Sequence, residues 1–256
     1  MMRALLMIVL FLTGALSCAA QLPSIKEDGP FQDSRPGNQW RQVVENHGSS
    51  SISAMLSIFH CPGSGGFKSV DSVRVYDPMF HYGTDRDVLP GESVEMNVED
   101  PTRCPGGVAA AIFADGHTEG DPQTVKRLFA VRQGVYEALG DTISLLHTVA
   151  GGNGNTQNAM RLIDERCQTV AHEKTIDSDE RTAMVMIYSQ LKAILSDPES
   201  VLRAPLHAAA TPQPDIGEVV STSKVSRDQA RAIVMSRQLE EWRSALESNL
   251  GPAGGV

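Results

Sequence analysis

Hydrophobic and polar residues alternate along residues 40–114, and this period of two predicts β-strands. The clearest run, residues 52–59, predicts a strand that is buried mainly on one side. The uniformly apolar run 108–114 predicts a central strand covered on both faces. Shorter alternating runs occupy residues 73–76, 80–82 and 94–98. Turn residues separate these runs, and no helical pattern lies between them. The runs therefore predict an antiparallel sandwich of six or seven strands.

At Asp121 the period of the apolar positions changes to about 3.6, which predicts helices. Asp121 is a good N-cap and Pro122 suits the first helical position, so a helix is expected to begin there and to end at Gly151. A second apolar stripe covers residues 160–170, and a third helix is predicted to begin near Asp177. The chain is therefore predicted to be α+β, with its helices after the sandwich.

These changes of pattern divide the chain into six segments. They are a leader at 1–20, an extended N-terminal segment at 21–39, a β-sandwich domain at 40–120, a helical region at 121–196, a linker rich in Pro, Ala and Ser at 197–225, and an amphipathic helix at 226–250. Ser226 and Gln229 are predicted to cap the last helix. Its Trp242 is expected to dock the helix on the others, the alternative being a partner-binding face.

The composition is that of a globular protein, with 41% hydrophobic and 21% charged residues among 256. The net charge is −9, and residues 21–120 hold 7 basic and 14 acidic side chains. This balance disfavours nucleic acid as a partner, because clustered lysine and arginine bind the phosphate backbone. The acidity is interpreted as a solvated surface, and an interface for a cationic partner is the alternative.

Residues 1–20 have the plan of a secretory signal peptide, in which Arg3 precedes an apolar run that ends in small residues. Cleavage after Ala20 predicts a mature protein that begins near Gln21 and is periplasmic or extracellular. The alternative is a lipoprotein acylated at Cys18, although the leucine stands two residues before this cysteine and not three. No later apolar run reaches the length of a membrane span, so no transmembrane domain is expected after cleavage.

Three cysteines follow the predicted cleavage site: Cys61, Cys104 and Cys167. Export favours disulfide formation, and three cysteines allow three pairings. Cys61 and Cys104 each begin a Cys-Pro-Gly turn at the end of a predicted strand, which favours a bridge between them. A thiol metal site or redox centre is the weaker alternative, because no Cys-x-x-Cys occurs. Cys167 falls on the apolar stripe of the second helix and is predicted to be a small core residue.

The usual catalytic signatures are missing from the sequence. There is no Gly-x-Ser-x-Gly elbow, no His-Glu-x-x-His, no Walker loop and no Gly-x-Gly-x-x-Gly. The glycine-rich residues 151–155 link two predicted helices and lack the Lys-Ser or Lys-Thr of a phosphate loop. The sequence therefore favours a protein that is not an enzyme, and it predicts no cofactor.

One segment, residues 115–121, carries potential metal ligands at alternate positions. They are Asp115, His117, Glu119 and Asp121. Three carboxylates suit calcium, but Lys126 stands where an EF-hand needs its twelfth-position acid, and a zinc site would need His60 or His81 as well. The simpler interpretation, which we favour, is a turn built on Gly116 and Gly120 with Asp121 as the helix cap.

Three stretches support a resemblance to a known group of proteins. They are residues 46–54 (Asn-His-Gly-Ser-Ser-Ser-Ile-Ser-Ala), residues 89–93 (Leu-Pro-Gly-Glu-Ser) and residues 110–122, which end in Asp-Gly-x-x-x-Gly-Asp-Pro. With these motifs the chain resembles uncharacterised secreted bacterial proteins over about residues 40–147. The resemblance implies an immunoglobulin-like β-sandwich that leads directly into a helical region, and it implies no catalytic residue.

These observations predict an exported, non-catalytic protein whose sandwich is a binding or structural module of the cell envelope. Its expected partner is a protein or a glycan. The alternative is a metal-dependent hydrolase centred on Asp115, His117 and Glu119. A third possibility is an oligomer formed through Trp242 and the last amphipathic helix.

Overall fold

The computed structural model describes residues 22–32, 39–63, 69–78, 86–152, 154–196, 216–223, 225–247 and 249–250. Three features expected from the sequence lie outside these ranges: the signal peptide with Cys18, the alternating run 80–82 with His81, and residues 197–215 of the linker.

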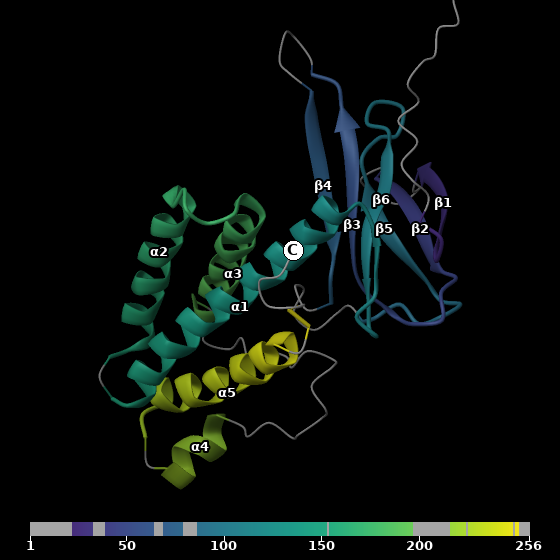
Figure 1. Cartoon of the computed structure of the whole chain (residues 1–256). Helices are drawn as coiled ribbons and strands as arrows, with labels where there is room; N and C mark the ends of the chain where they lie inside the picture. Colours follow the sequence, from purple (N-terminus) through teal and green to yellow (C-terminus); the bar gives the residue numbers. More distant parts are fainter. Residues whose placement is uncertain are drawn as a thin grey trace, which may run out of the picture.

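The strands form two antiparallel sheets that face each other as two layers (Figure 1). One sheet has the order β1-β2-β5 and consists of β1 (Ile25–Gln32), β2 (Trp40–Asn46) and β5 (Ser93–Val98). The other has the order β4-β3-β6-β7 and consists of β4 (Val70–Tyr76), β3 (Ile52–Cys61), β6 (Gly106–Phe113) and β7 (Thr118–Gly120). The prediction of antiparallel sheets before the helices is confirmed, with seven strands among the described residues.

Strand β3 is buried on both faces, so the prediction that it is covered mainly on one side is wrong. Met55 lies in the core between the two sheets, whereas Ala54 and Leu56 pack against a helix on the outer face. That helix comes from a distant part of the chain, so the alternation within residues 52–59 gives no indication of it. The central position of β6, between β3 and β7, agrees with its continuous apolar run.

Two carboxylates join the sheets along one open side of the sandwich. Glu27 of β1 accepts a hydrogen bond from the backbone N–H of Val108 in β6 at 3.1 Å, and another from the amide of Gln42. Glu119 of β7 accepts one from the backbone N–H of Ser24 at 3.1 Å. Burial raises the pKa of Glu27, and the hydrogen bonds from Val108 and Gln42 partly oppose this rise.

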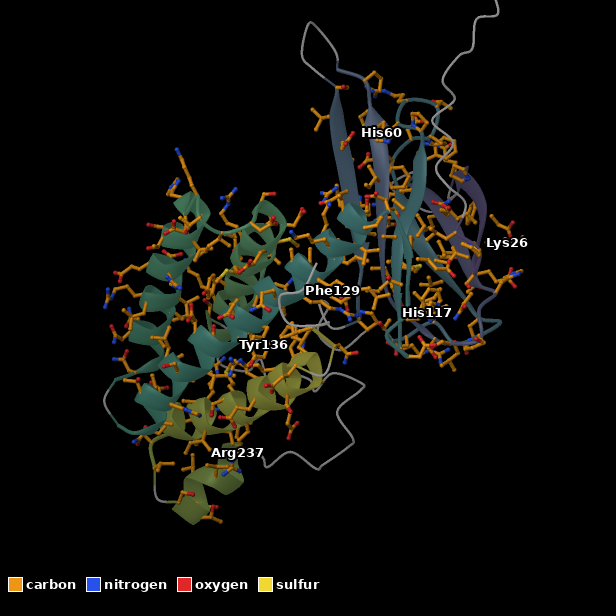
Figure 2. The ribbon with its side chains drawn as sticks, in the orientation of Figure 1. Lys26, His60, His117, Phe129, Tyr136 and Arg237 are labelled. Atoms are coloured by element: carbon orange, nitrogen blue, oxygen red, sulfur yellow. A yellow bond between two sulfur atoms is a disulfide. The ribbon has the colours of Figure 1, made fainter. Side chains whose placement is uncertain are left out.

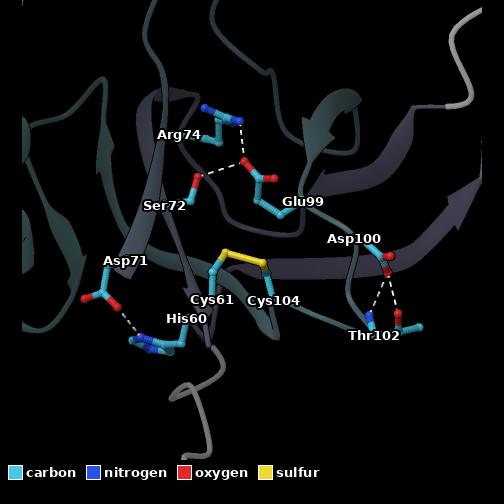
Figure 3. The surroundings of a disulfide bond; sticks show 9 residues. All are labelled: His60, Cys61, Asp71, Ser72, Arg74, Glu99, Asp100, Thr102 and Cys104. Carbon is cyan, nitrogen blue, oxygen red and sulfur yellow. Dashed lines mark hydrogen bonds and ion pairs between the residues drawn. A yellow bond between two sulfur atoms is a disulfide. The ribbon is translucent and has the colours of Figure 1, made fainter. Parts of the chain in front are cut away.

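The opposite side of the sandwich is closed by Glu99, which follows β5. Its carboxylate accepts hydrogen bonds from the hydroxyl of Ser72, at 2.8 Å, and from the guanidinium of Arg74, both in β4 (Figure 3). Beside them the predicted disulfide between Cys61 and Cys104 is confirmed. It joins the end of β3 to the loop before β6 and so closes a segment with a sequence separation of 43 residues.

The second half of the described chain is helical. Its elements are α1 (Pro122–Ala150), α2 (Thr156–His172), α3 (Ser178–Ser196), α4 (Ile216–Ser223) and α5 (Arg227–Glu247). The capping predictions are confirmed at two helices. The Asp121 carboxylate accepts the N–H of Thr124 at 3.0 Å at the start of α1. The side chains of Ser226 and Gln229 accept each other's backbone N–H at the start of α5.

Helix α4 lies within residues 197–225, where the sequence predicts a linker, so the structure differs there. Val219 of α4 is buried against Ala230 and Val234 of α5, and these contacts explain why a short helix forms. The predicted extended segment 21–39 likewise contains β1, whose pairing with β2 makes it part of a sheet.

Helix α1 is 29 residues long and contributes to both halves of the protein. Leu128 and Phe129, near its start, pack on the outer face of the sheet formed by β3, β4, β6 and β7 (Figure 2). Leu139 and Leu146, farther along, lie in the core shared with α2, α3 and α5. In Figure 1 the helix runs from the sandwich into the bundle without a break.

Two expectations for the bundle agree with its packing. Trp242 is 2% exposed and lies in the common helical core, so it docks α5 within the chain. Cys167 is a free thiol that packs, half buried, against the same core.

Arg231 of α5 donates hydrogen bonds to the carbonyls of Ile194 and Leu195, and it thereby satisfies backbone acceptors in the last turn of α3.

A buried ion pair joins the sandwich to the helices. Arg132 of α1 and Asp77, directly after β4, have side chains that are each 1% exposed, with 2.7 Å between Nε and Oδ2. The guanidinium also donates to the carbonyl of Ser53 in β3 at 2.9 Å and to the carbonyl of Asn249, beyond α5, at 3.1 Å. One side chain thus connects β3, the end of β4, α1 and the C-terminal end of α5.

We predict that Arg132→Met lowers the free energy of unfolding by about 3–5 kcal/mol, because it leaves the Asp77 carboxylate buried without a cation. Urea denaturation of Arg132→Met, Asp77→Ala and the double variant measures the coupling. The double variant should cost less than the sum of the single variants, by at least about 1 kcal/mol.

The matched control is Arg161→Met, which removes an exposed ion pair with Glu165 on α2. Its expected cost is under about 1 kcal/mol. The prediction would be contradicted if the free-energy costs of Arg132→Met and Asp77→Ala simply added in the double variant. It would also be contradicted if Arg132→Met cost no more than the control.

Candidate functional site

Four segments meet at one end of the sandwich, and we call this region the loop end. It comprises residues 22–24, 46–51, 86–92 and 113–117. Backbone hydrogen bonds connect the segments: the N–H of His47 donates to the carbonyl of Ser24 at 2.8 Å, and the N–H of Ala114 donates to that of Ser51 at 2.8 Å. Figure 2 shows His117 at this end of the sandwich and His60 at the other.

Asn46 organises the loop end from within. Its side chain is fully buried, and its amide donates to the carbonyls of Ser50 at 2.9 Å and Val88 at 2.7 Å. Its side-chain oxygen accepts the N–H of Gly48, and its backbone pairs with Gly91 and Glu92. A buried amide with this many partners holds loops from distant parts of the chain in one arrangement.

The surface above Asn46 is polar, with small apolar parts. Ser49, Pro90 and His117 are exposed, and Leu89 is 43% exposed, which is high for a large hydrophobic residue. Loops held on a rigid scaffold are where proteins most often carry their binding groups. The loop end is therefore the candidate functional site.

The four candidate metal ligands of residues 115–121 are engaged in three separate contacts. Asp115 accepts from His117, Glu119 accepts from Ser24, and Asp121 caps α1. Gly116 has a φ of +87° and Gly120 a φ of +110°, so the favoured interpretation of a glycine-based turn agrees with the structure. Residues 118–120 add strand β7, which the sequence does not predict.

His60 does not join this loop. It lies near the far end of β3, where its backbone N–H donates to the carbonyl of Pro105 and its ring contacts Asp71. Ile52, at the near end of β3, is eight residues away, which corresponds to about 26 Å along a strand. Over the ranges that the structure describes, no group of three or more His, Cys, Asp or Glu side chains is placed to hold one metal ion.

His117 is held in a defined orientation at the loop end. Its ring stacks on Phe113 with 3.9 Å between the centroids, and Nδ1 lies 2.5 Å from the Asp115 carboxylate. Because a carboxylate only accepts, Nδ1 carries the proton and Nε2 is the acceptor nitrogen when the ring is neutral. The same contact lowers the pKa of Asp115, so this carboxylate stays ionised.

A pocket of about 340 Å³ lies at the side of the loop end, at the start of β1. Among the described residues its lining consists of Leu22, Pro23, Ile25, Lys26 and His47. Leu22 and Ile25 belong to the core between the sheets and are almost fully buried, whereas Lys26 and His47 are exposed.

Comparisons with known proteins found no related sequence or structure. No protein-family model matches the chain, and no curated protein or solved structure matches it either. Among the described residues, no helix combines the length and apolar composition needed to cross a membrane.

Sequence reasoning missed the two side chains that organise the site and its support. Gln42, Val44 and Asn46 are the buried positions of β2 and lie on its inward face. A polar residue at an inward position could therefore have indicated the role of Asn46. Arg132 lies between Leu128 and Val135 on the apolar stripe of α1, which was a comparable signal. In both cases the partners come from distant segments, and only the folded structure identifies them.

We predict that calcium or zinc, added to metal-free protein, leaves Tm unchanged, because Glu119 and Asp121 are engaged away from the Asp115–His117 pair. Thermal unfolding with and without each ion measures this, since a ligand that binds only the native state raises Tm. A metal-dependent rise in Tm that disappears in His117→Ala would show that a metal site exists here.

We also predict that Glu27→Gln changes how stability depends on pH. The pKa of Glu27 is raised above 4.5 in the folded protein, so the folded state binds the proton more tightly than the unfolded state. The stability contributed by the protonated carboxyl is present below pH 4.5 and is lost as pH rises through the folded pKa.

Urea denaturation across this range should therefore show a shallower loss of stability in Glu27→Gln than in the wild type. Glu241→Gln, at an exposed position of α5, is the control and should follow the wild type. Parallel pH profiles for Glu27→Gln and the wild type would contradict the prediction.

Proposed function

We propose that this chain is an exported, non-catalytic binding protein of the cell envelope, and that the loop end of its sandwich contacts the partner. The observation that carries the proposal is the fully buried Asn46, whose hydrogen bonds hold the loop segments 46–51 and 86–92 together. Loops fixed in advance lose little conformational entropy on binding, and a rigid binding surface requires this property.

The strand order supports an immunoglobulin-like sandwich. Constant-type immunoglobulin domains place the first, second, fourth and fifth strands in one sheet and the third, sixth and seventh in the other. Here β1, β2 and β5 share a sheet, as do β3, β6 and β7, and only the fourth strand, β4, has changed sheets. This order also supports the resemblance to secreted bacterial proteins with such a sandwich.

Two further observations favour export and a binding role. The Cys61–Cys104 disulfide is typical of oxidising compartments outside the cytoplasm. The mixture of Ser, Gly, His, Pro and Leu at the loop end provides adaptable hydrogen bonds around small apolar contacts. The exposed aromatic rings of the described loop-end residues are the imidazoles of His47 and His117, so the surface suits a protein partner better than a sugar that stacks on a large ring.

Site-specific photo-crosslinking in the cells that produce the protein tests the proposal. A photoreactive amino acid at Ser49 or Leu89 should give a discrete adduct, because both side chains are exposed at the loop end. The matched position is Gln168, exposed on α2, which should give none.

Asn46→Ala, combined with the probe at Ser49, should reduce the adduct severalfold, because the loops lose their common support. A folded Asn46→Ala protein with undiminished adduct would contradict the role of Asn46. Absence of an adduct from both loop-end positions, or the same adducts from Gln168, would contradict the binding surface itself.

A further inference from the structure

The disulfide joins two residues that lie directly opposite each other on neighbouring strands. The register of β3 and β6 pairs Phe59 with Gly106, so Cys61 lies opposite Cys104 at the next position on the same face. Their Cα atoms are 4.2 Å apart, close to the separation of a non-hydrogen-bonded pair in an antiparallel ladder. The backbone pairing therefore brings the two cysteines together by itself.

Backbone contacts also hold the two strands beside the disulfide. The N–H of His60 donates to the carbonyl of Pro105 at 2.9 Å, and the pairing continues from Gly106 along β6 as far as Phe113. An antiparallel ladder accommodates two side chains that face each other without a covalent bond. The disulfide can therefore open while β3 and β6 stay paired.

The disulfide lies where another molecule can reach it. Both cysteines are partly exposed, and the residues beside them, Pro62, Arg103 and Pro105, are exposed. Thiol–disulfide exchange requires that a thiolate reach one of the sulfur atoms, and exposed disulfides are the ones that exchange most easily.

The covalent bond fixes residues 99–104, which cross from the sheet of β5 to the sheet of β6 (Figure 3). At the start of this crossover Glu99 contacts Arg74, but these side chains are 30% and 49% exposed, so the ion pair is weak. At its end the N–H of Cys104 donates to the carbonyl of Asp100 at 2.7 Å, a contact within the crossover. The disulfide is therefore the strongest attachment of the crossover to β3.

We propose that Cys61–Cys104 is an exchange site for a protein dithiol, and that its reduction in the folded protein loosens residues 99–104 and the contacts of Glu99. A thiolate of the dithiol attacks one sulfur, and the other sulfur leaves as a thiolate that takes up a proton. The second thiol of the dithiol then resolves the mixed disulfide, so the dithiol is oxidised and this chain gains two thiols.

This site is independent of the proposed binding function. His60, next to Cys61, lies at the end of the sandwich opposite the loop end (Figure 2). Reduction here leaves the hydrogen bonds of Asn46 intact.

The rate of reduction in urea tests whether the folded protein reacts. The full chain is treated with dithiothreitol, and maleimide labelling of Cys61 and Cys104 is followed by peptide mapping. Below the unfolding transition the rate constant should change less than about twofold with urea. Reduction through global unfolding would instead accelerate at least about fivefold per molar urea, because the unfolded population grows exponentially.

Two comparisons complete the kinetic test. Cys167→Ser removes the free cysteine of α2 and should leave the rate unchanged. Reduced thioredoxin, a protein dithiol, should label the same two cysteines while far-UV circular dichroism and tryptophan fluorescence remain native.

Amide hydrogen exchange tests the structural consequence. In the reduced protein, and in the double variant with Cys61→Ser and Cys104→Ser, the amides of Arg103 and residue 104 should exchange at least about tenfold faster than in the oxidised protein. The amide of Ala114, which donates to Ser51 at the loop end, is the internal control and should not change.

Several results would overturn the proposal. They are a reduction rate that rises with urea as global unfolding does, loss of the native signals on reduction, and failure of thioredoxin to reduce the bond. Equal exchange of the amides of residues 103 and 104 in both redox states would overturn the structural consequence. The crosslinking experiment at the loop end is unaffected by any of these results.

Discussion

The structure depends most on the buried contact between Arg132 and Asp77. A guanidinium and a carboxylate that are almost completely removed from water are tolerated only when their geometry and remaining hydrogen bonds are satisfied. The carbonyls of Ser53 and Asn249 provide that satisfaction. Because the four groups come from the sandwich, from α1 and from the region beyond α5, forming the ion pair requires that all of them be in place. The contact therefore fixes how the sandwich sits on the helices.

The same contact supports the candidate site. Ser53 follows the loop-end segment 46–51 by only two residues, and its hydroxyl also donates to the carbonyl of Ile112, next to Phe113. Arg132 thus fixes the first residues of β3 through the carbonyl of Ser53, and Asn46 fixes the adjoining loops through the carbonyl of Val88. The binding surface that we propose at the loop end would therefore need little reorganisation on contact with a partner, because its loops are already fixed.

Local patterns were sufficient where the cause of the structure was local. The continuous apolar run 108–114 identified β6, Asp121 and Ser226 identified helix starts, and two Cys-Pro-Gly turns identified the disulfide. Contacts between distant segments were not predictable in this way. The outer cover of β3 comes from Leu128, and α4 forms because Val219 meets Ala230, so neither follows from its own sequence. Residues 115–121 illustrate the same limit. Their alternate spacing suggested four converging metal ligands as an alternative, whereas in the fold Asp115 pairs with His117, Glu119 accepts from Ser24 and Asp121 caps α1.

The sandwich and the helices should unfold as one cooperative unit because of the Arg132 contact. The chain has two tryptophans, Trp40 in β2 and Trp242 in the helical core, so each half has its own fluorescent reporter. In Trp242→Phe, urea unfolding followed by Trp40 fluorescence reports the sandwich, while far-UV circular dichroism of the same samples reports mainly the helices. Coincident transitions are predicted for this protein, and their separation is predicted once Arg132→Met is added. Two separate transitions in the protein with Arg132 intact would contradict the account.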